Sequence, residues 1–245
     1  MIVDIWTVAT KEWREYVILR GSARGGVLGL LLFAAFVGVV MPIEIGASWV
    51  QTPIAVLGAF WLALILVLSV IGDSFAGERE RHTLETVLAT RLPDRAILAG
   101  KMVAAVGYGW ALTLVAMLLG LLAVNVVHGQ GQLLLFPPIT ALGILEAGLL
   151  GAALTGGAGA LVSLHSTSVR EAQQRLSIAM MGVFFGLLIG LQLLPHPWLA
   201  ALGMAVVNAS EGLLLLVIGL VLGLVDLGLL VALGARFQRS RLILD

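Results

Sequence analysis

The chain has no cysteine, and only 11% of its 245 residues are charged. Without cysteine it can form no disulfide, no thiolate metal site and no thiol nucleophile. Hydrophobic residues make up 60% of the sequence, and this excludes a soluble domain, because no soluble fold has enough interior to hide that apolar surface. The sequence therefore predicts an integral membrane protein of the all-α class, surrounded by membrane lipids. We expect no nucleic-acid partner.

Basic residues are few and unevenly distributed. The 14 lysines and arginines form four clusters: Lys11, Arg14, Arg20 and Arg24; Arg79, Arg81, Arg91, Arg95 and Lys101; Arg170 and Arg175; and Arg236, Arg239 and Arg241. A helix needs about 20 apolar residues to cross a bilayer, and positive segments stay on the cytoplasmic side. Six spans satisfy both rules, at about 26–43, 53–72, 102–127, 137–164, 176–194 and 212–235. We therefore expect a six-span domain over 25–245 in the cell (inner) membrane, with both termini cytoplasmic.

Two other segments are predicted to lie at the membrane surface. Residues 1–24 place Asp4, Lys11 and Glu15 on one face, which favours an amphipathic interfacial helix over a poorly ordered tail. Its apolar face consists of Ile2, Ile5, Ala9, Trp13 and Tyr16. Residues 198–207 are apolar but too short to cross, which predicts an outer re-entrant or interfacial segment within 195–211, between spans five and six. A longer, kinked fifth span is the alternative. Asn208 and Ser210 are placed to cap span six.

The charged segment 73–101, between spans two and three, carries the clearest functional pattern. Leu84, Val87 and Leu88 form an apolar ridge at helical spacing, which predicts a short amphipathic helix over about 83–90. Pro93 ends this helix, and Asp94 is placed to cap the next one. A ridge this small has no apolar surface of its own to pack against. It therefore suits docking into a cleft of a soluble partner. A helix lying on the bilayer surface is the other interpretation.

The same segment contains a longer motif, made of Asp73, Phe75 to Arg81, Thr83, Leu84, Glu85, Leu88, Ala89, Thr90, Ile97, Leu98, Gly100 and Lys101. It resembles the segment after the second span of type-2 ATP-binding-cassette (ABC) exporter permeases. The chain departs from that pattern at His82, where the family usually has Gly, and at Pro93, which comes two residues late. A weaker similarity covers residues 166–173. Length, span number and the two surface segments also match, so the resemblance extends over essentially the whole chain.

The resemblance implies a half-transporter, which pairs with a second permease copy or close paralogue and with cytoplasmic ATPase subunits. It implies that the segment couples to the ATPase through Glu78, Arg79, Glu80, Arg81, Thr83, Leu84, Glu85, Val87 and Leu88. The chain itself has no phosphate-binding loop, because Gly100-Lys101 lacks the upstream Gly and the following Ser or Thr. We expect no catalytic residue, metal site or cofactor in this chain, and ATP and magnesium in the partner ATPase.

Two acids and three glycines inside predicted spans are further candidates. Glu146 and Asp226 would each cost about 2.5–3.5 kcal/mol at mid-membrane unless protonated, paired or facing water. No basic residue inside a span can pair with them, so they are candidates for the transport path, with a protonated packing residue as the alternative. Gly182, Gly186 and Gly190 repeat at every fourth position, which predicts close helix packing, either at a subunit interface or within one subunit.

Two other functions compete with the exporter permease. An ion-coupled secondary transporter would use Glu146 and Asp226, but it predicts two-half repeats and broken helices that the sequence does not clearly contain. A non-transporting membrane scaffold leaves the coupling-like segment 73–101 without a role. The substrate stays open, although the apolar spans favour a hydrophobic molecule.

Overall fold

The chain folds as a bundle of helices. The computed structural model describes residues 1–18, 32–83 and 91–237, and within these ranges every regular element is a helix. Five helices are long and apolar enough to cross a membrane. They are α5 (Ile54–Ile71), α8 (Asp94–His128), α9 (Pro138–Leu164), α10 (Val169–Leu193) and α12 (Glu211–Arg236). The prediction of an all-α, multi-pass membrane protein is confirmed.

The predicted first span is described only in its second part, because its residues 26–31 lie outside the described ranges. The described part is an apolar helix over Leu32–Ile45 that contains the π-helical turn η2 (Phe36–Val40) and continues as α3 (Met41–Ile45). It packs tightly on α8. A Cβ added at Gly38 would lie 3.0 Å from the Ala116 Cβ, and one at Gly120 would lie 2.9 Å from Pro42, so glycine permits this close approach.

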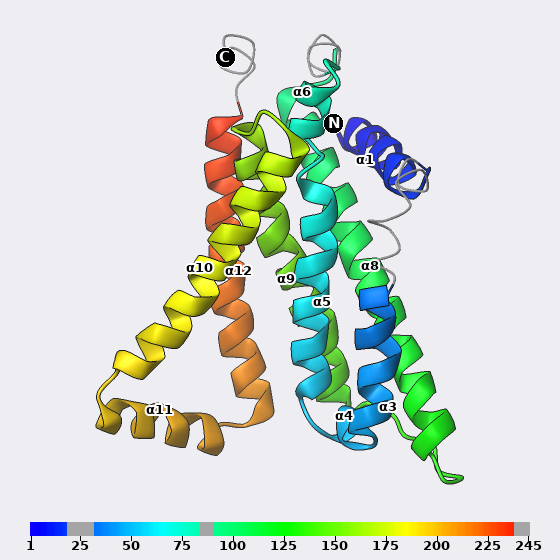
Figure 1. Cartoon of the computed structure of the whole chain (residues 1–245), viewed down its shortest axis with the longest axis vertical. Helices are drawn as coiled ribbons and strands as arrows, with labels where there is room; N and C mark the ends of the chain where they lie inside the picture. Colours follow the sequence, from blue (N-terminus) through cyan, green and yellow to red (C-terminus); the bar gives the residue numbers. More distant parts are fainter. Residues whose placement is uncertain (19–31, 84–90, 238–245) are drawn as a thin grey trace.

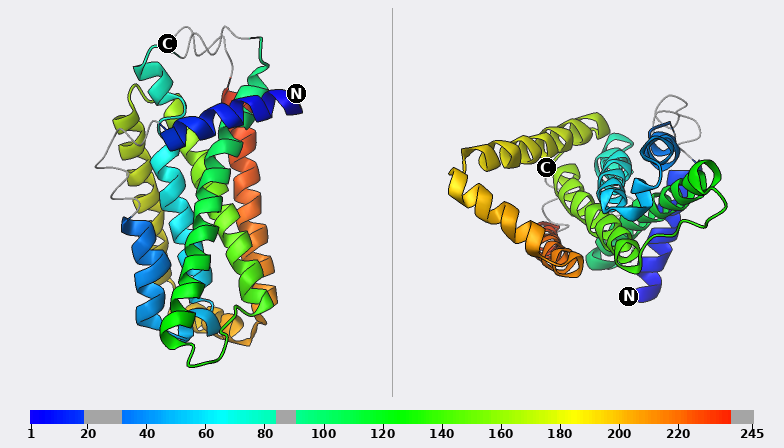
Figure 2. Two further views of the ribbon diagram at one scale, coloured as in Figure 1. Left: turned by 90° about the vertical axis from the view of Figure 1, so that its right-hand side faces the viewer. Right: turned by 90° about the horizontal axis from the view of Figure 1, so that it is seen from below.

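The middle of the bundle consists of α5, α8 and α9 (Figure 1). Residues such as Ala59, Leu62, Ala63 and Val67 of α5 are fully or almost fully buried, because this helix is covered by α8 and α9. The helix α1 (Ile2–Ile18) lies across the end of the bundle, against α8 (Figure 2). The short helix α6 (Ala76–Glu80) lies at the same end as α1, whereas α4 (Ser48–Gln51) and α11 (His196–Asn208) lie at the opposite end (Figure 1).

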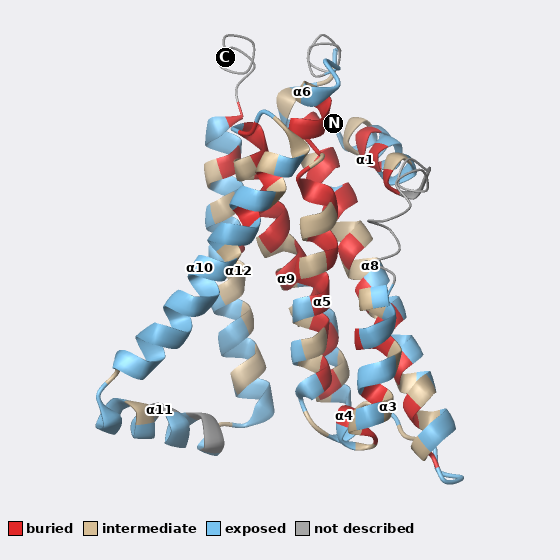
Figure 3. Ribbon diagram, in the orientation of Figure 1, coloured by how far each residue is buried: buried red, intermediate tan, exposed pale blue. Residues whose placement is uncertain are grey.

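The helix α10 leaves the bundle toward the end that carries α11, whereas α12 stays beside α9 (Figures 1 and 2). Residues 181–193 of α10 are all exposed, and most of the first half of α12 is exposed as well (Figure 3). The helix α11 joins them and lies across their ends (Figure 1). Leu194 is extended between α10 and α11, so the two are separate helices and not one kinked span. With 13 residues, α11 is about 20 Å long, too short to cross a bilayer.

Several helices begin outside their apolar stretch. The helix α10 starts at Val169, capped by the Ser168 side chain, well before the predicted span 176–194. Hydropathy marks the part of a helix that lies in lipid, and the charged first turns extend beyond it. The prediction that Asp94 caps α8 is wrong: Pro93 is the N-cap residue, and Asp94 lies in the first turn. Ser210 caps α12, since its hydroxyl oxygen accepts a hydrogen bond from Leu213 N at 3.3 Å.

Candidate functional site

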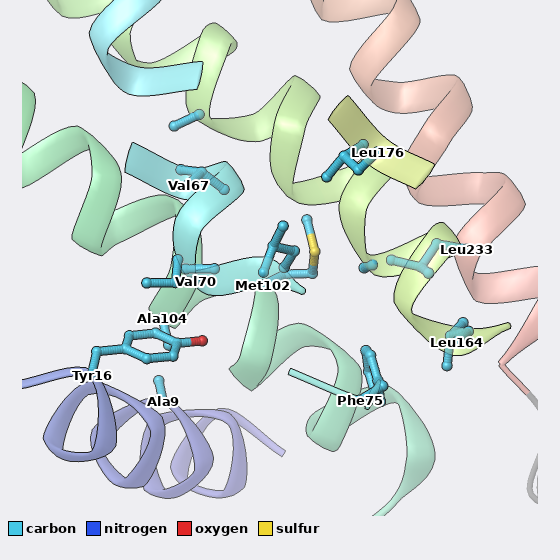
Figure 4. Packing of buried hydrophobic residues seen from close by; sticks show 14 of the residues in the cluster. Ala9, Tyr16, Val67, Val70, Phe75, Met102, Ala104, Leu164, Leu176 and Leu233 are labelled. Carbon is cyan, nitrogen blue, oxygen red and sulfur yellow. The ribbon is translucent and has the colours of Figure 1, made fainter. Parts of the chain in front are cut away.

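The helix α1 buries one narrow face against the start of α8. Val8, Ala9, Glu12 and Tyr16 are buried on this face, whereas Ile2 is 83% exposed. Ala9 and Tyr16 point into the cluster that also contains Val70 and Ala104 (Figure 4). The predicted apolar face is therefore divided: part of it packs on the bundle, and the rest remains exposed, as an interfacial helix requires.

A buried ion cluster joins α1, α6 and α8. The Lys101 Nζ lies 2.8 Å from Glu12 Oε1, 2.9 Å from Glu78 Oε1 and 2.7 Å from the carbonyl oxygen of Ser74. Lys101 is 2% exposed, and the two glutamates are each 3% exposed. Charges so deeply buried are tolerated only where the pairing geometry is good, so the cluster fixes how the three helices meet. The same ammonium lies 5.3 Å from the centre of the Phe75 ring.

Lys11 adds a second positive charge at the rim of this ion cluster. Its Nζ lies 3.3 Å from Glu12 Oε1, 3.3 Å from Glu78 Oε1 and 3.1 Å from Glu15 Oε1. Partial burial by itself lowers the pKa of Lys11, but attraction by the three carboxylates outweighs it and holds the pKa above its ordinary value. Lys11 therefore stays charged at physiological pH, and two ammonium groups balance two buried carboxylates.

Residues 72–80 are also hydrogen-bonded to the end of α9 and the residues that follow it. The Ser163 hydroxyl accepts hydrogen bonds from Phe75 N at 3.2 Å and Ala76 N at 2.9 Å, and it donates to the carbonyl of Gly72 at 3.1 Å. The Arg79 guanidinium donates to the carbonyls of Ser166 and Leu164, at 2.7 and 3.1 Å. These bonds satisfy carbonyl groups that the end of a helix leaves without partners.

A third connection reaches the start of α10. The Val169 N–H donates to Glu80 Oε2 at 3.1 Å, so an acidic residue of α6 lies at the positive end of a long helix. Within the same turn, Thr167 N donates to Glu171 Oε2 at 2.8 Å. One short segment after α5 thus contacts α1, α8, α9 and α10.

The predicted coupling residues divide between described and undescribed parts of the chain. Glu78, Arg79 and Glu80 make the contacts above, Arg81 Nη1 lies 3.2 Å from Asp73 Oδ1, and Thr83 N donates to the carbonyl of Glu78 at 2.8 Å. The remaining four, Leu84, Glu85, Val87 and Leu88, lie outside the described residues.

Four side chains that form this site were not among the candidates: Lys11, Glu12, Lys101 and Ser163. The available signal for Lys101 was its position as the last residue of the long motif that resembles the permease family.

Comparison with known proteins decides the family. The model of the family described as ABC-2 family transporter protein matches residues 48–235, which is most of the chain. The chain belongs to the ABC-2 transporter family. No curated protein matches it. The resemblance to type-2 ABC exporter permeases is therefore confirmed at the level of the family, and the anchored segment after α5 lies inside the matched region of this permease.

The two intramembrane acids of the permease have different surroundings. Glu146 on α9 lines a cavity between α5, α9 and α12, and its carboxylate lies against Gly219, where a Cβ would collide with it. Asp226 is 6% exposed on α12, and neither of its carboxylate oxygens has a hydrogen-bond partner within the described ranges. Two helical turns separate Gly219 from Asp226, about 10 Å along the axis, so the fold does not bring the two acids together.

The three glycines of α10 pack on nothing within the described permease. A Cβ added at Gly182, Gly186 or Gly190 would meet no atom within 4 Å. Of the two interpretations of this repeat, packing within one subunit therefore has no support among the described residues. The ridge is open to lipid or to another protein. In the ranges 1–18, 32–83 and 91–237, no three His, Asp or Glu side chains are grouped so that they could hold a metal ion.

Proposed function

We propose that this permease is the membrane half of an ATP-driven exporter, coupled to a separate cytoplasmic ATPase through residues 73–101. The family assignment supports transport by an ABC-type permease. One structural observation carries the coupling: residues 72–83 are bonded on one side to α1 and α8 and on the other to α9 and α10. A force applied to residues 84–90, which follow directly, is passed to four helices by these bonds.

The proposed orientation places this end of the bundle in the cytoplasm. Every described lysine and arginine lies on α1, α6, the segment around it, or the adjoining ends of α8, α10 and α12. These elements all lie at one end of the molecule (Figure 1). Positive charge is retained on the cytoplasmic side during insertion, so α11 and α4 face outward in the cell (inner) membrane, and both termini are cytoplasmic.

The proposed assembly contains two permeases, either two copies or a copy and a close paralogue. Support comes from α10 and α12, whose apolar residues are exposed over a large continuous area, and from the open glycine ridge on α10. Glycines at every fourth position let a second helix approach closely in lipid. ATP and magnesium are bound by the partner ATPase, and this chain supplies the path by which the substrate crosses the membrane.

The coupling proposal is tested by the double substitution Leu84→Ala with Leu88→Ala. The two leucines supply the apolar ridge of the proposed docking helix, and loss of two buried leucines costs a few kcal/mol of association. We expect the variant to reach the membrane in normal amounts but to lose both co-purification with the ATPase and stimulation of ATP hydrolysis.

A matched control replaces two leucines far from the proposed docking site, Leu213 and Leu216, which are exposed on the outer half of α12. This control pair should leave the ATPase bound. Full ATPase stimulation by the Leu84 and Leu88 variant would contradict the coupling role. A chain that co-purifies with no ATPase at all under gentle extraction would contradict the exporter assignment itself.

A further inference from the structure

An apolar cavity with one acidic residue lies inside the membrane part of the bundle. Its volume is about 400 Å³, and it is formed between α5, α9 and α12. Its wall contains Val56, Phe60, Leu150 and Leu222, and Glu146 is the one titratable side chain among its described residues. Cavities of about 300–1,000 Å³ lined mainly by apolar side chains, with few polar groups, are typical of small-molecule sites.

A second cavity continues the first toward the end of the bundle that carries α11. It has a volume of about 210 Å³ and shares Val56, Leu57, Leu215 and Ile218 with the first. It adds the Thr140 and Glu211 side chains near the starts of α9 and α12. Together the two form a groove from mid-membrane to the outer end, with acidic groups at Glu146 and Glu211. Gly219, which lies beside Glu146, is eight residues after Glu211 on α12. The two acids are therefore at levels about 12 Å apart along the axis of this helix.

The charge of this groove is of one sign. Among the residues that the structure describes, no lysine, arginine or histidine lines either cavity. Among the described residues, neither Glu146 nor Glu211 makes a side-chain hydrogen bond or an ion pair. An ionised carboxylate in apolar surroundings is costly unless a positive group accompanies it. The described wall supplies no such group, so the Glu146 carboxyl in this cavity is either protonated or paired with the positive group of a ligand.

We propose that the groove binds a hydrophobic cation, an amphiphilic molecule with an apolar body and one positive group, and that Glu146 pairs with that positive group. The apolar body contacts α5 and α12, and the passage toward Glu211 gives the cation a second acidic group at the outer end. This inference names the substrate class of the proposed exporter and so rests on the proposed function. Gly219 leaves the space in which the Glu146 carboxylate lies.

A pair of probes with the same shape and opposite charge tests this directly. Tritiated tetraphenylphosphonium and tetraphenylborate are titrated against the purified full chain in zwitterionic lipid nanodiscs. We expect saturable binding of the cation and none of the anion. Glu146→Gln should weaken cation binding about tenfold or more, because the charge-assisted contact is lost. Glu146→Asp, which keeps the charge, should retain the preference for the cation.

The controls separate charge at this site from charge in general. Glu44→Gln removes an exposed acid of α3 that lines neither cavity, and it should bind the cation as the native chain does. Gly219→Ala keeps Glu146 but displaces its carboxylate, so it should weaken binding. Equal binding of both probes, no saturable binding, or unchanged affinity in Glu146→Gln would overturn the proposal. The assay needs no ATPase, so its failure leaves the coupling experiment unaffected, and failure of coupling leaves the binding result intact.

Discussion

At the scale of single residues, the least expected feature is that Lys101 is almost fully buried between two glutamates. Breaking a buried pair by removing one partner is costly, because the other charge stays behind in a region of low dielectric. Replacement of the cluster as a whole has a much smaller cost, because no unpaired charge remains. Comparing the stability of a variant that lacks one charge with that of a variant that lacks all three therefore distinguishes a structural ion cluster from charges that are merely close together.

We predict that Lys101→Met lowers the stability of the permease by about 3–5 kcal/mol, since Glu12 and Glu78 lose their closest positive partner. Thermal unfolding in detergent, followed by tryptophan fluorescence, measures the change. The triple variant Lys101→Met, Glu12→Gln and Glu78→Gln should recover most of the loss. Lys11→Met is the matched control, because the Lys11 side chain is 48% exposed and its removal should cost less. A smaller effect of Lys101→Met than of Lys11→Met would count against the cluster.

At the scale of elements, sequence reasoning works best where the cause is local. The second predicted span, 53–72, differs by one residue at each end from α5 (Ile54–Ile71), because the desolvation of each side chain in lipid depends on that side chain alone. The Ser210 cap is local in the same sense. The helix predicted to begin after Pro93 already included the charged first turns of α8. The charged first turns of α10 lie outside the predicted span 176–194, because hydropathy marks only the part of a helix that lies in lipid.

Contacts between distant segments could not be predicted in this way. Lys101 and Glu12 are 89 positions apart, and their pairing requires α1 to fold back over the start of α8. The opposition of Glu146 and Gly219 depends on the rotation of α9 and α12 about their axes, which their almost uniform apolar surfaces do not specify. Glu146 was a candidate from the sequence, but neither the cavity nor the ion cluster was predicted from it.

The loops between elements test the proposed orientation. The chain has no cysteine, so a single introduced cysteine can be labelled without background. We predict that Thr83→Cys and Gln132→Cys react with a membrane-impermeant maleimide from opposite faces, Thr83→Cys only from the cytoplasmic side. Both positions are exposed, and neither has a positive φ, in contrast to their neighbours His82 and Gln130. Labelling of both cysteines in intact cells would refute the orientation.

At the scale of the whole molecule, the described chain is not self-sufficient at its outer half. The bundle of α5, α8 and α9 buries its own residues, whereas α10 and α11 expose apolar side chains on nearly every side and α12 exposes those that do not face α9 (Figure 3). Lipid can cover such a surface, but lipid does not require a glycine at every fourth position. Close packing of a second helix does require small residues at such a spacing, because only small residues let two backbones come close enough.

We therefore predict that Gly186→Trp separates the permease dimer. A tryptophan in the middle of the glycine ridge holds the neighbouring helix away, and the packing contacts along Gly182 and Gly190 are lost with it. Native mass spectrometry of the detergent-extracted chain should change from dimer to monomer. Gly228→Trp is the matched control, since Gly228 on α12 is also free of any neighbour within 4 Å but belongs to no such ridge on α10. If Gly186→Trp stays dimeric while Gly228→Trp dissociates, the interface lies on α12. A native chain that is monomeric at all concentrations would leave the glycine ridge facing lipid or a paralogue, and co-expression with candidate permeases from the same cell would then separate these two cases.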